Sequence, residues 1–185
     1  ALKESGITLE ELEAQLEAAL NSTDAPPMID WNKKTDRELI DFLVNVHHAS
    51  LHRQLPEFDR WFVRALKVHA DHIGELLPVY KLFTALRTEL EPHLLKEEMM
   101  VFPAILNRRP PEEMKSVLKE LEAEHAGAGD TLRKLNALTD GYKTPEFACP
   151  TVEMLYDGLM RLESALHDHI YLENNILFPR AVAKK

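Results

Sequence analysis

The stretch His169-Ile-Tyr-Leu-Glu173 is followed five residues later by Phe178-Pro179, and the same pattern occurs upstream as His93-Leu-Leu-Lys-Glu97 and Phe102-Pro103. Residues i and i+4 lie on the same face of an α-helix. Each pair therefore directs an imidazole and a carboxylate to one side. Two such helices predict a site in which nitrogen and oxygen ligands converge on a pair of metal ions.

A single histidine accompanies each copy of this pattern, His48 before the first and His125 before the second. These two histidines are 77 residues apart, so the chain consists of two related halves. Each half offers one histidine and one His/Glu pair. The repeat predicts a pseudo-twofold axis that relates the first two helices to the last two, with the metal site on or near it.

The composition excludes several classes of protein. The chain has 185 residues, 45% of them hydrophobic and 29% charged, which suits one globular domain. A net charge of −9 argues against nucleic acid as a partner, because phosphate binding needs a basic face. Cys149 is the one cysteine, which excludes an internal disulfide and fits the reducing cytoplasm. No apolar run approaches the roughly 20 residues of a membrane span.

Two parts of the chain are expected. Residues 1–30 form an N-terminal helix and linker: Thr8 to Glu11 reads as a capping box that opens a helix to about Leu20. A loop rich in helix breakers follows at residues 21–27. Residues 31–185 then form the main body, which is expected to carry the site.

Four long stripes of apolar residues at helical spacing predict an all-α protein, an antiparallel four-helix bundle. Pro56 is expected to bend or restart the first helix. Gly74 and Pro78 mark the boundary before the second helix. The residues expected on the inner stripes, in helix order, are Ile40, Val44, His48, Leu51, Phe58, Phe62, Ala65 and His69; Val79, Phe83, Leu86, Leu90, His93, Glu97 and Met100; Leu118, Leu121, His125, Ala128, Leu132 and Leu135; Leu155, Leu159, Leu162, Leu166, His169, Glu173 and Ile176.

The polar residues of interest lie within these apolar stripes. A buried carboxylate without a partner costs several kcal/mol. No Lys or Arg lies on the stripes at the level of Glu97 and Glu173, since Lys96 is to the side. A lone histidine on an apolar face is usually a hydrogen-bonded core residue, and a lone glutamate there can be protonated. The duplication of the whole pattern favours a metal over this metal-free alternative.

The donor atoms indicate which metal. Imidazole and carboxylate without thiolate suit Fe, Mn or Zn. A structural zinc site needs four ligands, whereas at least six are available here. Two ions bridged by Glu97 and Glu173 use the set better, and iron is favoured because helix bundles commonly hold carboxylate-bridged iron pairs. The ferritin pattern Glu-x-x-His occurs once among these histidines, from Glu122 to His125.

The other histidines complete the expected count. His69 is expected as a fifth imidazole, and periodicity alone leaves open whether His47 or His48 is the ligand. Two octahedral irons offer about twelve positions. Bridging carboxylates, five imidazoles and a bridging oxo or hydroxo group fill all but one, which is left for dioxygen or nitric oxide. Histidines expected beside or outside the site are His47, His52, His72 and His167.

Over residues 31–185 the sequence resembles hemerythrin-like di-iron proteins, specifically the repair of iron centres (RIC) family. The resemblance rests on both His-x-x-x-Glu blocks and on Val46-His-His48, Gln54-Leu-Pro56, Val68-His-Ala-Asp71 and Glu122-Ala-Glu-His125. It implies the hemerythrin-like bundle, with two Fe ions as cofactor. The metal ligands that it implies are His48, His69, His93, Glu97, His125, His169 and Glu173.

The resemblance also implies a function. RIC proteins are cytoplasmic and help to repair iron–sulfur clusters damaged by nitric oxide or oxidative stress, by iron donation or nitric oxide handling. Iron–sulfur proteins are then the clients, and the chain is expected to be a monomer or a homodimer. Alternatives are a reversible binder or sensor of dioxygen or nitric oxide, and a nitric oxide reductase. Family members usually carry an N-terminal domain with adjacent cysteines that this sequence lacks, so it is either an excised domain or a natural short form.

Overall fold

The computed structural model describes residues 29–146 and 148–183. The chain divides into two compact units, residues 1–33 and residues 34–185. The predicted helix from Thr8 to Leu20 and its loop lie outside the described residues. The described part of the first unit holds a 3-10 turn, η1 (Trp31–Lys33), beside which Lys33 pairs with Asp30 at 3.0 Å. The division of the chain at residue 30 stays a prediction.

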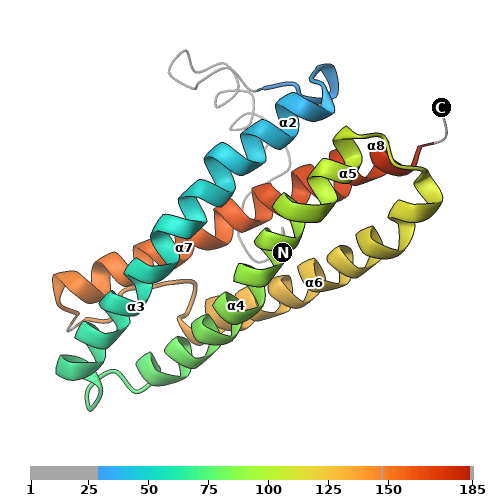
Figure 1. Ribbon diagram of the computed structural model, residues 1–185. Helices are drawn as coiled ribbons and strands as arrows, with labels where there is room; N and C mark the ends of the chain where they lie inside the picture. The colour runs from blue at the N-terminus through green and yellow to red at the C-terminus, as the bar shows by residue number, and fades with distance from the viewer. Residues whose placement is uncertain (1–28, 147, 184–185) are drawn as a thin grey trace, which may run out of the picture. The chain divides into compact units, whose positions relative to one another are not determined.

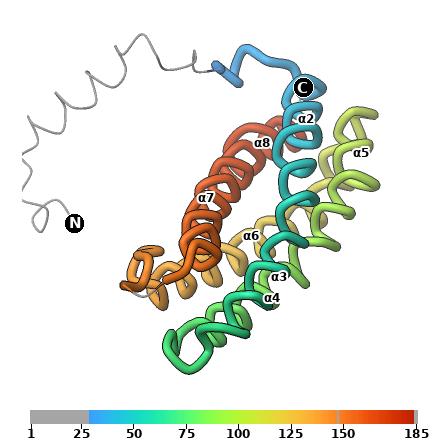
Figure 2. The backbone as a smooth tube through the Cα atoms, turned by 90° about the vertical axis from the view of Figure 1, so that its left-hand side faces the viewer, coloured from blue at the N-terminus to red at the C-terminus, as the bar shows by residue number. Residues whose placement is uncertain are grey.

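The second unit is an all-α bundle of four long helices (Figure 1). Short turns join the first helix to the second and the second to the third, whereas the longer segment 139–149 joins the third to the fourth. Figure 2 shows the same packing from the side. No strand occurs among the described residues. The elements are α2 (Asp36–Phe42), η2 (Leu43–His48) and α3 (Ala49–His69) in the first helix; α4 (Leu76–Lys96), η3 (Glu97–Val101) and α5 (Phe102–Leu106) in the second; α6 (Pro111–Leu138) in the third; and α7 (Pro150–Leu172), η4 (Glu173–Leu177) and α8 (Phe178–Val182) in the fourth.

Local sequence signals set the helix boundaries. Thr35 and Glu38 form a capping box at the start of α2. Pro111 and Pro150 occupy the first turns of α6 and α7, where a missing N–H costs nothing. Helix α3 continues through Pro56. The helix therefore does not restart at Pro56, because burial of the helix face on both sides of the proline outweighs one lost hydrogen bond. The other expected outcome, a bend at Pro56, stays a prediction.

The apolar core fills the half of the bundle that ends at the turn between α3 and α4. It consists of buried apolar side chains between residues 51 and 94 in the first two helices and between residues 132 and 166 in the last two. The ring centroid of Phe83 lies 5.1 Å from that of Phe58 and 5.3 Å from that of Phe62. Except for His69 at the end of α3, the polar residues of the inner stripes lie beyond this core, toward the end that carries α5 and α8.

The segments η2, η3 and η4 are wider, π-helical turns within otherwise regular helices. The N–H of Phe102 bonds to the carbonyl of Glu97, five residues back, and Phe178 bonds to Glu173 in the same way. In a regular α-helix two residues five apart differ by about 140° in direction. The extra residue in the wide turn lets each glutamate and its phenylalanine both point inward, with exposures of 0% and 2% in each copy.

These wide turns correct the predicted stripes at two places. Met100 was expected inside but is 63% exposed, and Val101 and Phe102 are buried in its place. In the first helix Leu43 is buried while Val44 is half-buried. The extra residue of each π turn shifts the inner face by one position. Of the remaining stripe residues only Ala128 is not fully buried.

Among the described residues, no helix has both the length and the apolar character that a membrane crossing requires.

Candidate metal centre

Six of the seven predicted ligands converge in the bundle interior. They form two groups that share both carboxylates, and within each group one ligand atom per residue lies within 4.8 Å of the others. All six residues are buried. The first group is His48, Glu97, His169 and Glu173, and the second is His93, Glu97, His125 and Glu173.

Each carboxylate lies between the two groups. Glu97 places one oxygen 3.2 Å from Nε2 of His93 and the other 3.4 Å from Nε2 of His48. Oε2 of Glu173 lies 3.0 Å from Nε2 of His169 and 3.2 Å from Nε2 of His125. Each glutamate thus contacts one imidazole of each group, which is the position of a bridging ligand.

The unpaired polar atoms test whether metal ions fit here. Both carboxylate oxygens of Glu97 and of Glu173 are buried without a hydrogen-bond partner among the described residues. No Lys or Arg in the described part of the chain pairs with them. Nε2 of His93 and Nε2 of His125 are 3.0 Å apart, the spacing of neighbouring ligands on one ion at about 2.1 Å. The donor set and its geometry therefore fit two metal ions.

Oxygen acceptors fix the outer nitrogens of three imidazoles. Nδ1 of His48 lies 2.7 Å from Oε1 of Glu98, and Nδ1 of His93 lies 2.6 Å from Oε2 of Glu124. Nδ1 of His125 lies 2.9 Å from the Asn174 side-chain oxygen. A ring that donates its Nδ1–H keeps the Nε2 lone pair for a metal.

Sequence reasoning missed these three partners, although a signal was present. Glu98 and Asn174 each follow a predicted glutamate ligand, and Glu124 precedes His125. A polar residue next to a ligand on a helix points about 100° away from it. From there it reaches the ligand of a neighbouring helix instead of the metal.

The predicted twofold relation is consistent with this arrangement. Exchanging the first two helices with the last two interchanges the two metal groups. The same exchange relates Glu98 to Asn174 and Glu124 to His47, so the halves differ in the groups around the ligands. Nδ1 of His169 has no hydrogen-bond partner among the described residues, and the ring of His47 lies 5.8 Å from that of His169.

The charges at the site are strongly coupled. Burial disfavours the charged form of His93, but contacts with Glu97 and Glu124 outweigh it and raise its pKa to about 9. Burial likewise disfavours the charged form of His48, but its contacts with Glu97 and Glu98 outweigh this effect and raise its pKa. Burial acts to raise the pKa of Glu173, yet His169 and His125 lower it overall. Without a metal the protonated forms of His48 and His93 are therefore favoured, and metal binding must displace these protons.

His69 does not belong to this centre. It is absent from both metal groups and lies at the far end of α3, 21 residues after His48. At 1.5 Å per residue that separation is about 30 Å along one continuous helix. The expected fifth imidazole is therefore wrong for this site, and four imidazoles remain.

The other histidines lie around or away from the centre. His48, not His47, is the member of the metal group, which settles the alternative that periodicity left open. His47 is half-buried, and His52 lies 3.6 Å from Glu98 at the surface. The two that are exposed and outside the site are His72 and His167.

Aromatic rings close one end of the centre. Phe178 stacks on His125 with centroids 6.0 Å apart and planes at 4°, and Phe102 lies 5.6 Å from His48. Both phenylalanines are 2% exposed. They shield the ligands from water on the side of α5 and α8.

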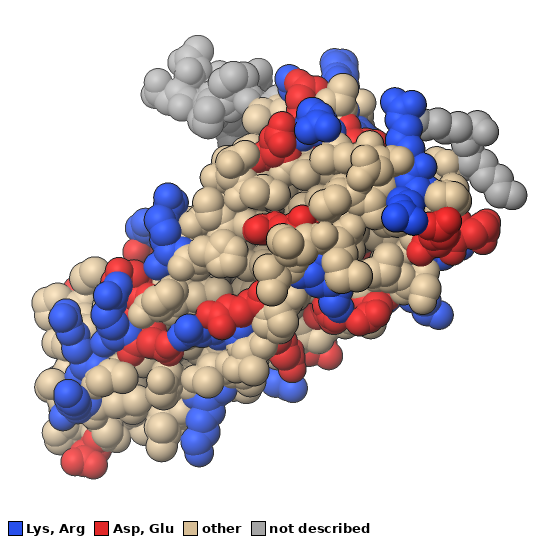
Figure 3. All heavy atoms as spheres, viewed as in Figure 1, with Lys and Arg blue, Asp and Glu red and all other residues tan. Residues whose placement is uncertain are grey.

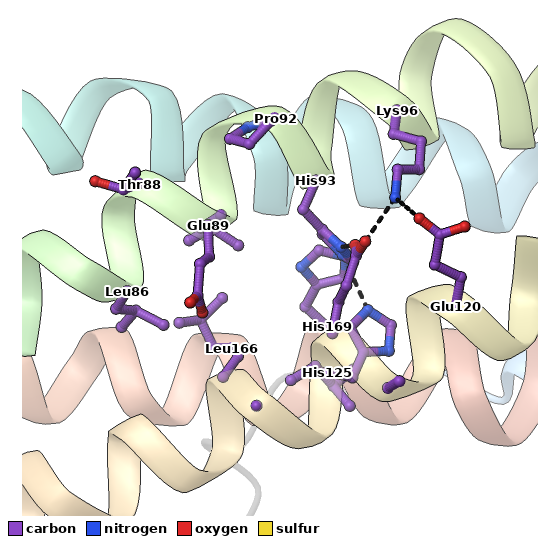
Figure 4. A pocket seen from close by; sticks show the side chains of 16 residues that line it. Leu86, Thr88, Glu89, Pro92, His93, Lys96, Glu120, His125, Leu166 and His169 are labelled. Atoms are coloured by element: carbon purple, nitrogen blue, oxygen red, sulfur yellow. Dashed lines mark hydrogen bonds and ion pairs between the residues drawn. The ribbon is translucent and has the colours of Figure 1, made fainter.

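A cavity of about 660 Å³ gives access from another side (Figure 4). It is bounded by α4, α6 and α7 and reaches His93, His125 and His169. At its edge Nζ of Lys96 bonds to Glu120 at 2.8 Å and to Glu124 at 2.6 Å. Lys96 is thus turned away from Glu97, as predicted, and supports the carboxylate that orients His93.

Comparisons with known proteins agree with this geometry. Residues 39–181, which include all six converging ligands, match the family described as Hemerythrin HHE cation binding domain. The chain is 34% identical over 177 residues to proteins named Iron-sulfur cluster repair protein YtfE from Escherichia coli O157:H7, from Escherichia coli O139:H28 and from Shigella boydii serotype 18. Each alignment covers 96% of this chain and 79% of the relative.

Proposed function

This chain belongs to the hemerythrin HHE cation-binding family and to the YtfE-type repair of iron centres proteins, and we propose that it holds two iron ions and serves the repair of iron–sulfur clusters. The clusters are those damaged by nitric oxide or oxidative stress. Iron–sulfur proteins of the cytoplasm are the proposed clients. The observation that best supports this proposal is the pair of fully buried carboxylates, each of which lies between imidazoles of both metal groups.

Iron suits the donor set, since imidazole and carboxylate ligands without thiolate are typical of non-haem iron. Glu97 and Glu173 are the proposed bridging ligands, together with an oxo or hydroxo group. With His69 excluded, about two of twelve coordination positions remain for small ligands. When bound, the iron pair supplies these positions and one-electron chemistry. The protein residues supply the fixed imidazoles and exclude water through Phe102 and Phe178.

Iron donation is the route that the cavity supports. Carboxylates of Glu89, Glu120 and Glu124 line it together with His93, and oxygen donors are suitable stepping positions for iron. Both imidazoles of the group that contains His93 and His125 line the cavity, whereas only His169 does so in the other group. Iron from the His93 group is therefore the proposed donated ion.

The test of donation is a transfer experiment. The protein is loaded with ⁵⁷Fe and mixed anaerobically with an iron–sulfur enzyme whose cluster was damaged with nitric oxide, in the presence of sulfide and a thiol. Recovery of client activity with ⁵⁷Fe in the client cluster is expected. Repair with unlabelled iron only, or no repair while both ions stay bound, contradicts donation.

The bridging role of the glutamates has its own test. Glu97→Ala and Glu173→Ala each remove a ligand shared by both ions, so iron content is expected to fall well below two per chain. Glu122→Ala removes an exposed carboxylate three residues from His125 and serves as the control. Retention of both irons in either bridge variant contradicts the assignment.

Gas chemistry is the second candidate, favoured by the two remaining coordination positions and the cavity that reaches the centre. Reversible spectral changes with dioxygen or nitric oxide support binding or sensing. Many turnovers of nitric oxide to nitrous oxide with an external reductant support a reductase. A single stoichiometric reaction supports neither.

A further inference from the structure

A second concave site lies where α2 packs against α5 and α8 packs against α6. It is a cavity of about 610 Å³, separate from the metal centre. Among the described residues that line it, Asp36 is the one acid, although the whole chain has a net charge of −9. Figure 3 shows Lys and Arg side chains standing out at this end of the bundle. The basic residues of the cavity are Lys34, Arg37, Arg108, Arg109 and Arg180.

Three of these cations have acidic partners. Nζ of Lys34 lies 2.9 Å from Glu38, and Nη1 of Arg109 lies 3.2 Å from Glu113.

Nη1 of Arg180 lies 3.3 Å from Asp36 and donates to the carbonyl oxygen of Lys34 at 3.0 Å. Arg180 therefore ties the end of the fourth helix to the start of the first, and its role is structural.

The guanidinium groups of Arg37 and Arg108 make no hydrogen bond or ion pair within the described part of the chain. They come from different walls of the cavity, Arg37 from α2 and Arg108 from the turn after α5. Two guanidinium groups without a counter-charge, in a concave site, are an excess of positive charge that the protein itself does not neutralise. An anionic ligand would neutralise it.

The backbone conformation at Arg108 is a second observation that supports an anion site. Its φ is 54°, in the left-handed region. Its N–H bonds to Ile105 at 2.9 Å and the N–H of Arg109 bonds to Ala104 at 3.1 Å. This is the helix-ending pattern whose left-handed position glycine usually occupies, because a side chain there is strained. The chain nevertheless places a guanidinium there, at the edge of the cavity.

We propose that this cavity binds a small organic anion with two negatively charged groups, carboxylates or phosphates, held by Arg37 and Arg108. Guanidinium groups bind such oxyanions in a bidentate manner. The cavity volume is in the range of small-molecule sites. Ile105, Leu106 and Met114 give it an apolar floor for the carbon skeleton of the ligand.

The experiment is isothermal titration calorimetry of the iron-loaded chain at low ionic strength, where charge screening is weak. The probes are glutarate, a dicarboxylate, and fructose 1,6-bisphosphate, a bisphosphate; both are weaker iron chelators than citrate. At least one is expected to saturate with a Kd below about 1 mM. Tighter binding of glutarate indicates a ligand with two carboxylates, and tighter binding of fructose 1,6-bisphosphate indicates a ligand with two phosphates. Iron content measured after the titration confirms that the metal centre was not stripped.

Variants make the test specific. Arg37→Gln with Arg108→Gln is expected to weaken binding by at least about tenfold, because two bidentate contacts are lost. The control, Arg53→Gln with Arg64→Gln, removes the same charge from exposed positions outside the cavity and is expected to change Kd by less than about twofold. In the unmodified chain, the bound probe is expected to slow hydrogen exchange in residues 104–109. No saturation by either probe, equal weakening in both double variants, or unchanged exchange overturns the proposal.

Discussion

Single residues next to the ligands determine how the imidazoles are held. Glu98 and Glu124 each present a carboxylate to the outer nitrogen of a ligand histidine, whereas Asn174 presents an amide oxygen. A carboxylate partner orients the ring and makes it a stronger ligand. The two halves of the chain therefore have the same ligands but different electrostatic support.

Glu124→Gln tests this support. The amide keeps the shape of the side chain but loses the charge that faces His93, so metal affinity is expected to fall about 10- to 100-fold. Competition with a chelator of known affinity measures it. Glu122→Gln makes the same change at an exposed position two residues away and is expected to leave affinity unchanged. Equal affinity in both variants contradicts an orienting role for Glu124.

His93 gives a prediction for the metal-free protein. Its pKa is raised to about 9, so its protonated form stabilises the fold. That contribution is complete below the unfolded pKa of about 6.5 and is lost as pH rises through about 9. The Tm of the metal-free chain is therefore expected to fall between about pH 6.5 and 9. His93→Gln should flatten this slope, and an equally steep slope in that variant contradicts the assignment.

At the scale of the elements, the π turns η2, η3 and η4 carry or adjoin three ligands: His48, Glu97 and Glu173. Such turns arise from one extra residue in an α-helix and are frequent at functional sites. Here the extra residue lets the ligand and the phenylalanine five positions later share a face. The proline after the phenylalanine cannot donate to the helix, and each one lies directly after a wide turn.

Deletion of Met100 together with Pro103→Ala tests this account. Removing the exposed extra residue places Phe102 four positions after Glu97. On a regular helix the two then differ by about 40° in direction, so both still point inward. The alanine removes the clash of proline with a regular helix. A cooperative thermal transition and retained iron are expected, because both ligands of this helix precede the deletion.

The control for this test is deletion of Ala85 with the same Pro103→Ala change. Ala85 is an exposed residue in the regular part of α4, so its loss rotates His93 and Glu97 by about 100° relative to the preceding core. Iron binding is expected to be lost. Similar iron contents in the two deletion variants contradict the role assigned to the wide turn.

At the scale of the whole bundle, the main apolar core and the metal centre occupy different parts of the same helices, although buried apolar residues such as Ile105 and Met114 also lie at the end with the centre. The half built on Phe58, Phe62 and Phe83 can pack without metal. The other half has two carboxylates that are 0% exposed and without hydrogen-bond partners in the described residues. The metal therefore contributes to the stability of one end of the bundle.

Metal removal is expected to lower the stability of the chain. Each ion stabilises the fold by about 2.7 kcal/mol when its free concentration is 100 times Kd. Two ions at that ratio correspond to a fall in Tm of roughly 10 to 20 °C on chelation. Calorimetry of the loaded, stripped and reloaded protein measures it. An unchanged Tm supports instead a metal-free bundle with a buried imidazole network.

The inner faces of the helices and five of the ligands could be predicted from the sequence because both depend on local periodicity, whereas only the family resemblance favoured His48 over His47. A residue four positions from another shares its face wherever the helix lies. The duplicated His-x-x-x-Glu pattern thus predicted the converging set His93, Glu97, His169 and Glu173. Met100 was misplaced because periodicity assumes 3.6 residues per turn, and a wide turn breaks that assumption.

The sequence by itself determined the helical bundle, its inner faces and the chemistry of the metal ligands, because these follow from spacing along the chain. Only the tertiary structure decided the level of each residue along the bundle. His69 has the right face, but the continuous α3 carries it about 30 Å from His48. Packing between helices also decided that Glu98, Glu124 and Asn174 hold the imidazoles, since these contacts join residues 31 to 50 positions apart.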